Sequence, residues 1–168
     1  MTLFNLAQAV GEALLARGWM LATAESCTGG GIAAAITEVA GSSQWFDRGF
    51  VTYSNQAKQD MLEVSAQTLM TFGAVSEQTV REMVTGALAH SGADVAVAVS
   101  GIAGPDGGTP DKPVGMICLA WGLKAREPVA CTEMFSGDRQ AIRSQTVECA
   151  LQGLLDVTAS AIGESLSG

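Results

Sequence analysis

A hydroxyl, a thiol and a run of glycines stand together in the stretch S-C-T-G-G-G at residues 26–31. An apolar run before it, residues 19–24, predicts a buried strand, and residues 32–39 have the pattern of a helix. Small residues at such a turn let backbone N–H groups approach a ligand, and the helix N-terminus favours negative charge. The turn suits a Ser26 nucleophile beside an oxyanion hole, or a phosphate cradle. The alternative is structural, with Ser26 as a helix N-cap in a tight turn; the candidate ligand contacts are Thr28, Gly29 and Gly30.

A serine nucleophile needs a base, and the sequence offers few. His90 is the single histidine, and it stands at the end of a predicted helix, which is usually a solvent-facing position. Lysine replaces histidine where burial lowers its pKa. Lys58 follows Tyr53 by five residues, and both could project into the same crevice as Ser26, where the phenol could relay a proton. The alternative places Tyr53 in the core and Lys58 on a solvated helix face.

Two further turns suit ligand binding. Residues 100–108, S-G-I-A-G-P-D-G-G, form a loop in which the backbone can approach a ligand, although the dinucleotide pattern G-x-G-x-x-G is absent. The candidate contacts there are Ser100, Gly101, Ala103 and Gly104. Arg139 begins a predicted helix after residues 136–138, where its guanidinium could bind a phosphate or carboxylate. An ordinary surface arginine is the alternative.

The elements that must position these residues alternate along the chain. Helical spacing runs from residue 3 to a stop at Gly18, and further helices are predicted at 32–39, in short pieces at 54–71, after Ser76, and at 138–166. Strands are predicted at 19–24, 50–53, 94–100, 114–121 and 129–135, the last two as a hairpin. This order predicts an α/β fold, a three-layer α/β/α sandwich with a mixed, mostly parallel sheet, in one domain over residues 1–168. The polar turns 26–31, 100–108 and 136–139 all follow strands, which predicts a site at the carboxyl ends of the strands.

Composition excludes several classes of protein. The chain has 168 residues, 48% of them hydrophobic and 15% charged, so it is not a disordered chain. Its net charge of −8 argues against broad nucleic-acid binding. The absence of a long apolar run or a secretory signal predicts a cytoplasmic protein without a membrane span. We expect no cofactor and no metal, because the four cysteines are scattered; Cys27 is expected to pack as a small buried hydrophobe. A homo-oligomer stays open, since Trp45 and Phe46 suit either a core or a subunit contact.

Six motifs resemble those of the CinA C-terminal domain family: A-E-S-C-T-G-G at 24–30, G-F-V-T-Y-S-N-Q-A-K at 49–58, G-A-V-S-E at 73–77, S-G-I-A-G-P-D-G-G at 100–108, K-P-V-G at 112–115 and F-S-G-D-R at 135–139. They occur in order through essentially the whole chain. The resemblance implies a three-layer α/β/α domain with a mixed sheet. It also implies hydrolysis of the carboxamide of nicotinamide mononucleotide (NMN), which gives nicotinic acid mononucleotide and ammonia in pyridine nucleotide salvage.

The same resemblance implies a catalytic set of Ser26, Tyr53 and Lys58. It implies a small nucleotide as the partner, and Arg139 with the glycine loops is the candidate for binding its 5′-phosphate. Three alternatives stay open: a non-catalytic nucleotide-binding paralogue, a serine amidase for another small amide, and a dehydrogenase built on Ser, Tyr and Lys. The dehydrogenase fits least, because it requires Tyr-x-x-x-Lys and this chain has four residues between Tyr53 and Lys58.

Overall fold

The computed structural model describes the backbone of residues 1–167 and the side chains of residues 1–161. Its strands are β1 (Leu21–Glu25), β2 (Phe46–Val51), β3 (Val95–Gly101), β4 (Met116–Leu123) and β5 (Val129–Met134). Its helices are α1 (Leu3–Arg17), α2 (Gly31–Thr37), α3 (Asn55–Leu62), α4 (Ala66–Phe72), α5 (Glu77–Ala89) and α6 (Arg139–Ser167), with a 3₁₀ turn at Ser42–Gln44. The order of helices and strands agrees with the sequence prediction.

The strands form one mixed sheet in the order β2-β1-β3-β4-β5. The pairs β2–β1 and β1–β3 are parallel, whereas β3–β4 and β4–β5 are antiparallel. Within the described chain, β4 therefore runs against the other strands. The predicted α/β class, the mixed sheet and the hairpin of the last two strands are confirmed.

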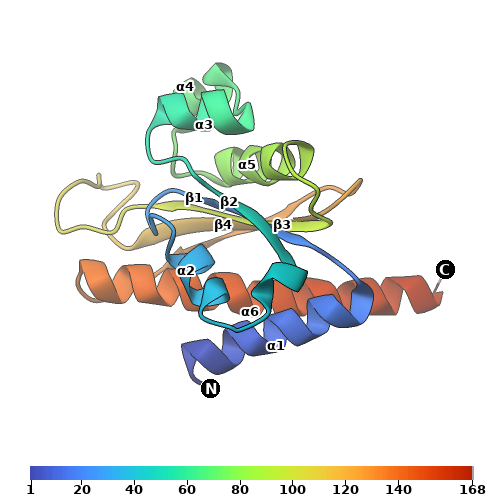
Figure 1. Ribbon diagram of the computed structural model, residues 1–168. Helices are drawn as coiled ribbons and strands as arrows, with labels where there is room; N and C mark the ends of the chain where they lie inside the picture. Colours follow the sequence, from blue (N-terminus) through green and yellow to red (C-terminus); the bar gives the residue numbers. More distant parts are fainter. Residues whose placement is uncertain (168) are drawn as a thin grey trace.

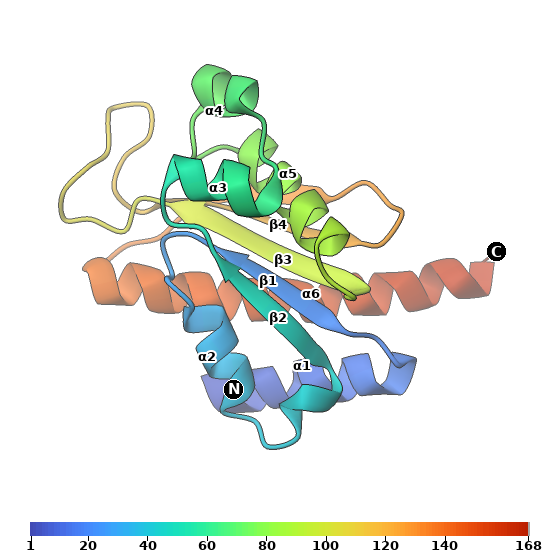
Figure 2. The same cartoon turned by 45° about the horizontal axis from the view of Figure 1, so that its top comes forward.

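Helices cover both faces of this sheet (Figure 1). One face packs on α1, α2 and α6, and the other packs on α5, with α3 and α4 outside it; Figure 2 shows the same layers from above. The alternation in β3 explains the two layers, because Val95, Val97 and Val99 point to the first face. Ala96 and Ala98 point to the second face and leave room for α5 to approach. Both faces of β1 and β3 are thus buried, as expected for strands covered on both sides.

The structure confirms two helix ends that local sequence signals predict. Gly18 ends α1 with φ 66°, a left-handed conformation that favours glycine. The Ser76 side chain accepts from the Thr79 N–H and caps α5, as the sequence predicts. Trp45 is buried in the core against Gly11 of α1, where an added Cβ would meet the indole at 2.6 Å.

The predicted strand at residues 50–53 is misplaced. β2 instead spans Phe46–Val51 and ends with Val51 opposite Glu25 of β1. One more hydrogen bond, from the Thr52 N–H to the Glu25 carbonyl, follows at 2.8 Å. The chain then leaves the sheet because Ser54 must adopt its N-cap position, where its side chain accepts from the Ala57 N–H and starts α3.

The three polar turns meet at one edge of the sheet. They follow β1, β3 and β5, whose directions agree, so their carboxyl ends lie at the same side. Figure 1 shows the loop after β3, the turn into α2 and the first turn of α6 together at the left. This is the edge where ligands collect in open α/β sheets.

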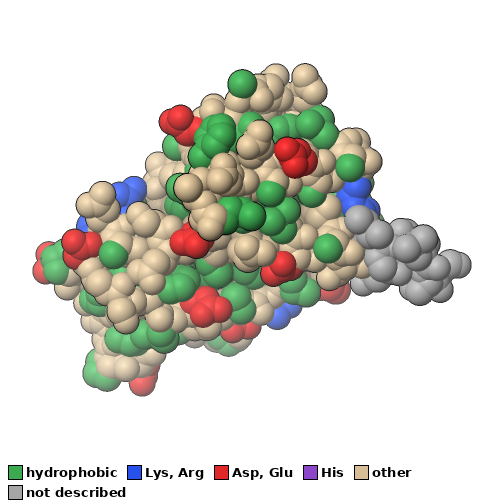
Figure 3. Space-filling model, turned by 90° about the horizontal axis from the view of Figure 1, so that it is seen from below, with side chains coloured by type: hydrophobic (Ala, Val, Ile, Leu, Met, Phe, Trp, Pro, Cys, Tyr) green, Lys and Arg blue, Asp and Glu red, His purple; other side chains and the backbone are tan. Residues whose placement is uncertain are grey.

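The described surface seen from below shows no feature that indicates a binding partner. The face seen from below carries scattered acidic side chains, and its described residues form no broad patch of lysine and arginine (Figure 3). Within the described residues, no helix is both long enough and apolar enough to cross a bilayer.

Candidate active site

Ser26 and Lys58 are in direct contact at the carboxyl end of β1. The Lys58 Nζ lies 3.0 Å from the Ser26 Oγ. Ser26 stands directly after β1 and is held there by its N–H, which donates to the Val99 carbonyl of β3. Lys58 reaches it from α3, and α2 is capped by Gly30 rather than Ser26. The alternative in which Ser26 is a helix N-cap is therefore wrong.

Burial defines the chemistry of Lys58. Its side chain is only 1% exposed, so the alternative of a lysine on a solvated helix face is wrong as well. Removal of water lowers the pKa of Lys58 below its ordinary value, because burial disfavours the charged form. Within residues 1–161, no carboxylate forms a salt bridge with its amine.

Two backbone carbonyls complete the surroundings of the Lys58 amine. They belong to Thr52, at 2.9 Å, and Tyr53, at 3.3 Å. A carbonyl oxygen only accepts, so each of them requires an N–H from the lysine. A neutral amine has two N–H groups and one lone pair, and the third direction faces the Ser26 hydroxyl. The geometry thus accommodates a neutral lysine that accepts the proton of Ser26.

Glu25 holds the turn that carries Ser26. Its buried carboxylate accepts from the Thr28 hydroxyl at 2.5 Å, and from the N–H groups of Ile32 at 2.8 Å and Ala33 at 3.0 Å. The carboxylate therefore occupies the N-terminus of α2, which the sequence offered as a cradle for a ligand anion. Glu25 was not singled out from the sequence, because a charged residue at the end of a strand carries no local signal of this role.

Arg143 fastens the same turn to α6. Its guanidinium donates to the carbonyls of Cys27 at 3.1 Å and Thr28 at 3.0 Å. More than a hundred residues separate Arg143 from the turn, so spacing along the chain could not reveal the contact. The turn that carries Ser26 is thus held from both sides, by Glu25 at its start and by Arg143 of α6.

A cavity of about 260 Å³ opens in front of Ser26 and Lys58. Its polar and charged lining also includes Ser100, Asp106, Tyr53 and Arg139. The remaining lining residues are Cys27, Ala74, Val75, Gly101, Ile102, Ala103 and Gly104. The structure thus brings the predicted catalytic residues together with the predicted contacts of the 100–104 loop and Arg139.

Arg139 connects the loop after β3 with Tyr53 on the other wall of this cavity. Its guanidinium donates to the Gly104 carbonyl at 2.8 Å and to the Tyr53 hydroxyl at 3.2 Å. Tyr53 is 61% exposed, which contradicts its placement in the core. The phenol therefore stands at the mouth of the cavity on Arg139, while the contact between Lys58 and Ser26 is direct. A second hollow, of about 810 Å³, lies on the other side of Arg139 and is also lined by Arg143.

Other predicted residues lie elsewhere. Thr28, Gly29 and Gly30 are absent from the described lining of the Ser26 cavity, and the Thr28 hydroxyl is bound to Glu25. Cys27 is buried, as expected, and burial raises the pKa of its thiol to about 11. His90 is absent from the described cavity lining and contacts the carboxylate of Glu63 at 2.8 Å.

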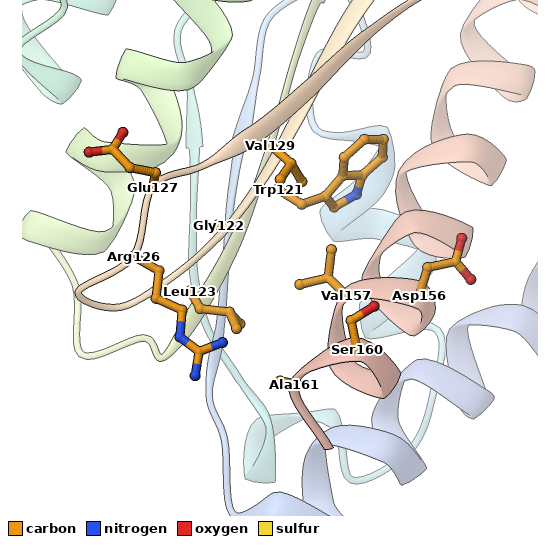
Figure 4. A pocket seen from close by; sticks show the side chains of 10 residues that line it. All are labelled: Trp121, Gly122, Leu123, Arg126, Glu127, Val129, Asp156, Val157, Ser160 and Ala161. Carbon is orange, nitrogen blue, oxygen red and sulfur yellow. The ribbon is translucent and has the colours of Figure 1, made fainter. Parts of the chain in front are cut away.

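The opposite end of the sheet holds a different hollow, of about 340 Å³ (Figure 4). It lies between the β4–β5 turn and α6, and its walls are mostly apolar. Figure 4 shows Ser160 on α6 beside the hollow, whereas the side chain of Glu127 on the turn points away from α6. Among the described residues of the chain, no group of three or more metal-ligating side chains is suited to a metal ion.

Comparison with known proteins decides the family. A model of the CinA C-terminal domain matches residues 3–158. The chain belongs to the CinA C-terminal domain family. It is 56% identical over 153 residues to the nicotinamide-nucleotide amidohydrolase PncC of Enterobacter agglomerans, covering 91% of this chain and 93% of that protein. The PncC of Escherichia coli K12 is 55% identical over 152 residues, covering 90% and 92%.

Solved structures of the CinA family share the fold. The competence/damage inducible protein CihA of Agrobacterium tumefaciens superposes with a TM-score of 0.90 at 49% identity, covering 92% of this chain and 94% of that one. A CinA superfamily protein of Klebsiella pneumoniae superposes with a TM-score of 0.91 at 42% identity, covering 95% and 99%. These neighbours confirm the predicted fold class and family.

Proposed function

We propose that this chain is a serine amidohydrolase that converts nicotinamide mononucleotide into nicotinic acid mononucleotide and ammonia. One observation carries the proposal: the hydroxyl of Ser26 lies 3.0 Å from the buried amine of Lys58 inside a cavity. The relatives named nicotinamide-nucleotide amidohydrolase supply the substrate, at 55% to 56% identity over most of the chain. We place the reaction in the cytoplasm, as a step of pyridine nucleotide salvage.

Acylation begins with the neutral amine of Lys58. It accepts the Ser26 proton directly, and Oγ attacks the carbonyl carbon of the carboxamide. The oxyanion faces the 101–104 loop. The N–H groups of Ala103 and Gly104 are suited to stabilise it, because they donate to no backbone acceptor in the described residues. Lys58 then returns the proton to the leaving nitrogen, the C–N bond breaks, and ammonia departs from an acyl-enzyme ester.

Deacylation repeats the same steps with water. Lys58 accepts a proton from the water, whose oxygen attacks the ester carbon. The C–O bond to Ser26 then breaks and the proton returns from Lys58 to Oγ; the carboxylic acid product loses its remaining proton to solvent and leaves as a carboxylate. The carbonyls of Thr52 and Tyr53 keep the lone pair of the amine directed at the reacting atoms throughout.

Binding of the nucleotide depends on the other wall of the cavity. Arg139 stands between the Ser26 cavity and the larger hollow, so a 5′-phosphate on its guanidinium leaves the pyridine ring beside Ser26. Tyr53 positions Arg139 through its hydroxyl, which is how the third member of the catalytic set acts in this proposal. Thr28, Gly29 and Gly30 support the turn from outside the cavity.

Ammonia release from nicotinamide mononucleotide tests the proposal. We expect the purified chain to release ammonia in the presence of EDTA, and Ser26→Ala to lose activity by about 10³-fold or more with an unchanged melting temperature. Ser91→Ala, at a partly buried serine outside the cavity lining, is the matched control and keeps full turnover. A wild-type chain that binds the nucleotide without releasing ammonia would instead be a binding paralogue, and the proposal would be wrong.

A further inference from the structure

One carboxylate of the Ser26 cavity has no role in the steps above. Asp106 lines the cavity together with Lys58 and Arg139, and it is the only carboxylate in the described lining. Within residues 1–161, its side chain has no hydrogen bond and no salt bridge, and the residue is exposed to solvent. The carboxylate is therefore available to a ligand in the cavity.

The loop that carries Asp106 is held in place on both sides. Gly104 and Gly107 adopt left-handed φ values of 76° and 86°, which turn the chain sharply around Asp106. A Cβ at Gly104 would meet the Val114 side chain at 2.5 Å, so the loop is packed closely at this point. The Gly104 carbonyl is also fixed by Arg139. The position of Asp106 at the cavity wall is thus determined by the fold.

Asp106 does not serve the catalytic base. Burial is the main cause of the lowered pKa of Lys58, and within residues 1–161 Asp106 forms no salt bridge with its amine. A carboxylate next to the amine would hold Lys58 in its charged form and oppose its action as a base. Asp106 therefore lines the cavity without being paired to the amine of Lys58.

The charges of the cavity match those of the substrate. Nicotinamide mononucleotide carries a pyridinium cation in its ring and a phosphate anion at the other end. With the carboxamide at Ser26 and the phosphate at Arg139, the cationic ring lies in the cavity that Asp106 lines. We propose that Asp106 recognises the positive charge of the pyridinium ring and makes the site selective for the oxidised ring over a neutral one. This inference rests on the proposed function.

Two ligands of nearly the same shape separate charge from contact. The reduced mononucleotide has a neutral dihydropyridine ring, and the oxidised one has the cation. We would measure the Kd of both by calorimetry in the Ser26→Ala background, with and without Asp106→Asn, at low ionic strength. We expect Asp106→Asn to raise the Kd of the oxidised nucleotide about tenfold, which corresponds to about 1.4 kcal/mol. The Kd of the reduced nucleotide should stay within about twofold.

Asp111→Asn is the matched control, because Asp111 is an exposed aspartate of the same loop outside the cavity lining. Asp111→Asn should change neither Kd. Raised salt should weaken binding of the oxidised nucleotide more in the Ser26→Ala protein that keeps Asp106 than in the one that also carries Asp106→Asn. An equal loss of affinity for both nucleotides, or no loss for either, would overturn the inference. Its failure is distinct from failure of the proposed function, which shows as a lack of ammonia release by the wild-type chain.

Discussion

The two ends of the sheet each carry a hollow, and only one has the groups for catalysis. The hollow at the β4–β5 turn is somewhat larger, about 340 Å³ against about 260 Å³, and has Ser160 and Glu127 in its lining. The Ser26 cavity differs because its amine is buried and has two carbonyl partners, which leave one direction open toward a hydroxyl. Volume and polar residues alone therefore do not make a reactive site. A serine becomes a candidate nucleophile where the fold forces an amine against it.

The largest expected effect comes from removal of that amine. Lys58→Met keeps the length and packing of the buried chain but has no base, so we expect kcat for ammonia release to fall by about 10³-fold or more. Lys124→Met, at an exposed lysine of the opposite end, should keep full activity. Steady-state kinetics would test both variants. Substantial turnover by Lys58→Met would remove the distinction between the two ends of the sheet.

The pH dependence of kcat/KM should reveal the buried amine of the Ser26 cavity. In the proposed mechanism Lys58 acts as a neutral amine, so kcat/KM should rise about tenfold per pH unit below its pKa and reach a plateau above it. Burial lowers that pKa, so the plateau should begin below the ordinary lysine value of 10.5.

The same shift affects stability. Between the lowered pKa of Lys58 and 10.5, the unfolded chain binds more protons than the folded one. The free energy of unfolding should therefore increase with pH in this range, and Lys58→Met should lose that increase. A pH–rate profile and denaturant unfolding at several pH values measure the two effects. A plateau at or above 10.5 would contradict a buried, neutral base.

A smaller effect is expected at the mouth of the cavity. Arg139→Ala removes the proposed phosphate contact and the tie to Gly104, so we expect KM to rise about tenfold, with a smaller change in kcat. Arg81→Ala, on the far side of the sheet, should leave both parameters unchanged. A fall in kcat without a change in KM would exclude Arg139 as the phosphate-binding residue.

The smallest effect is expected in the other hollow. Ser160→Ala removes the hydroxyl of the α6 wall in Figure 4, and ammonia release should stay within about twofold of the wild-type rate. The same assay applies. A large loss of activity in Ser160→Ala would mean that both ends of the sheet contribute to the reaction.

Much of this architecture was predictable because it depends on local patterns. The alternating valines and alanines of β3 and the cap at Ser76 each predict their element within a few residues. The polar turns after β1, β3 and β5 locate the site, since those strands run in one direction. Ser26 and Lys58 were paired from their motifs before any contact was visible.

Other parts of the site depend on contacts between distant segments. Thr28, Gly29 and Gly30 were expected to face a ligand, but Glu25 takes the Thr28 hydroxyl and lies at the start of α2. Neither this contact nor the hydrogen bonds from Arg143 to the turn have a periodic signal in the sequence. Asp106 is part of the motif at residues 100–108, but only the folded structure shows that it lines the cavity.

The carboxylate of Glu25 also gives the cavity a direction. Burial is the main cause of the raised pKa of the Cys27 thiol in the cavity wall, and the nearby negative charge of Glu25 raises it further. A second anion is repelled from that wall, whereas the guanidinium of Arg139 lies at the mouth of the cavity beside Tyr53. This arrangement favours an orientation in which the phosphate of a ligand lies at Arg139 and away from Cys27. The carboxylate of Glu25, which holds the turn, thus also influences how a charged ligand is oriented in the cavity.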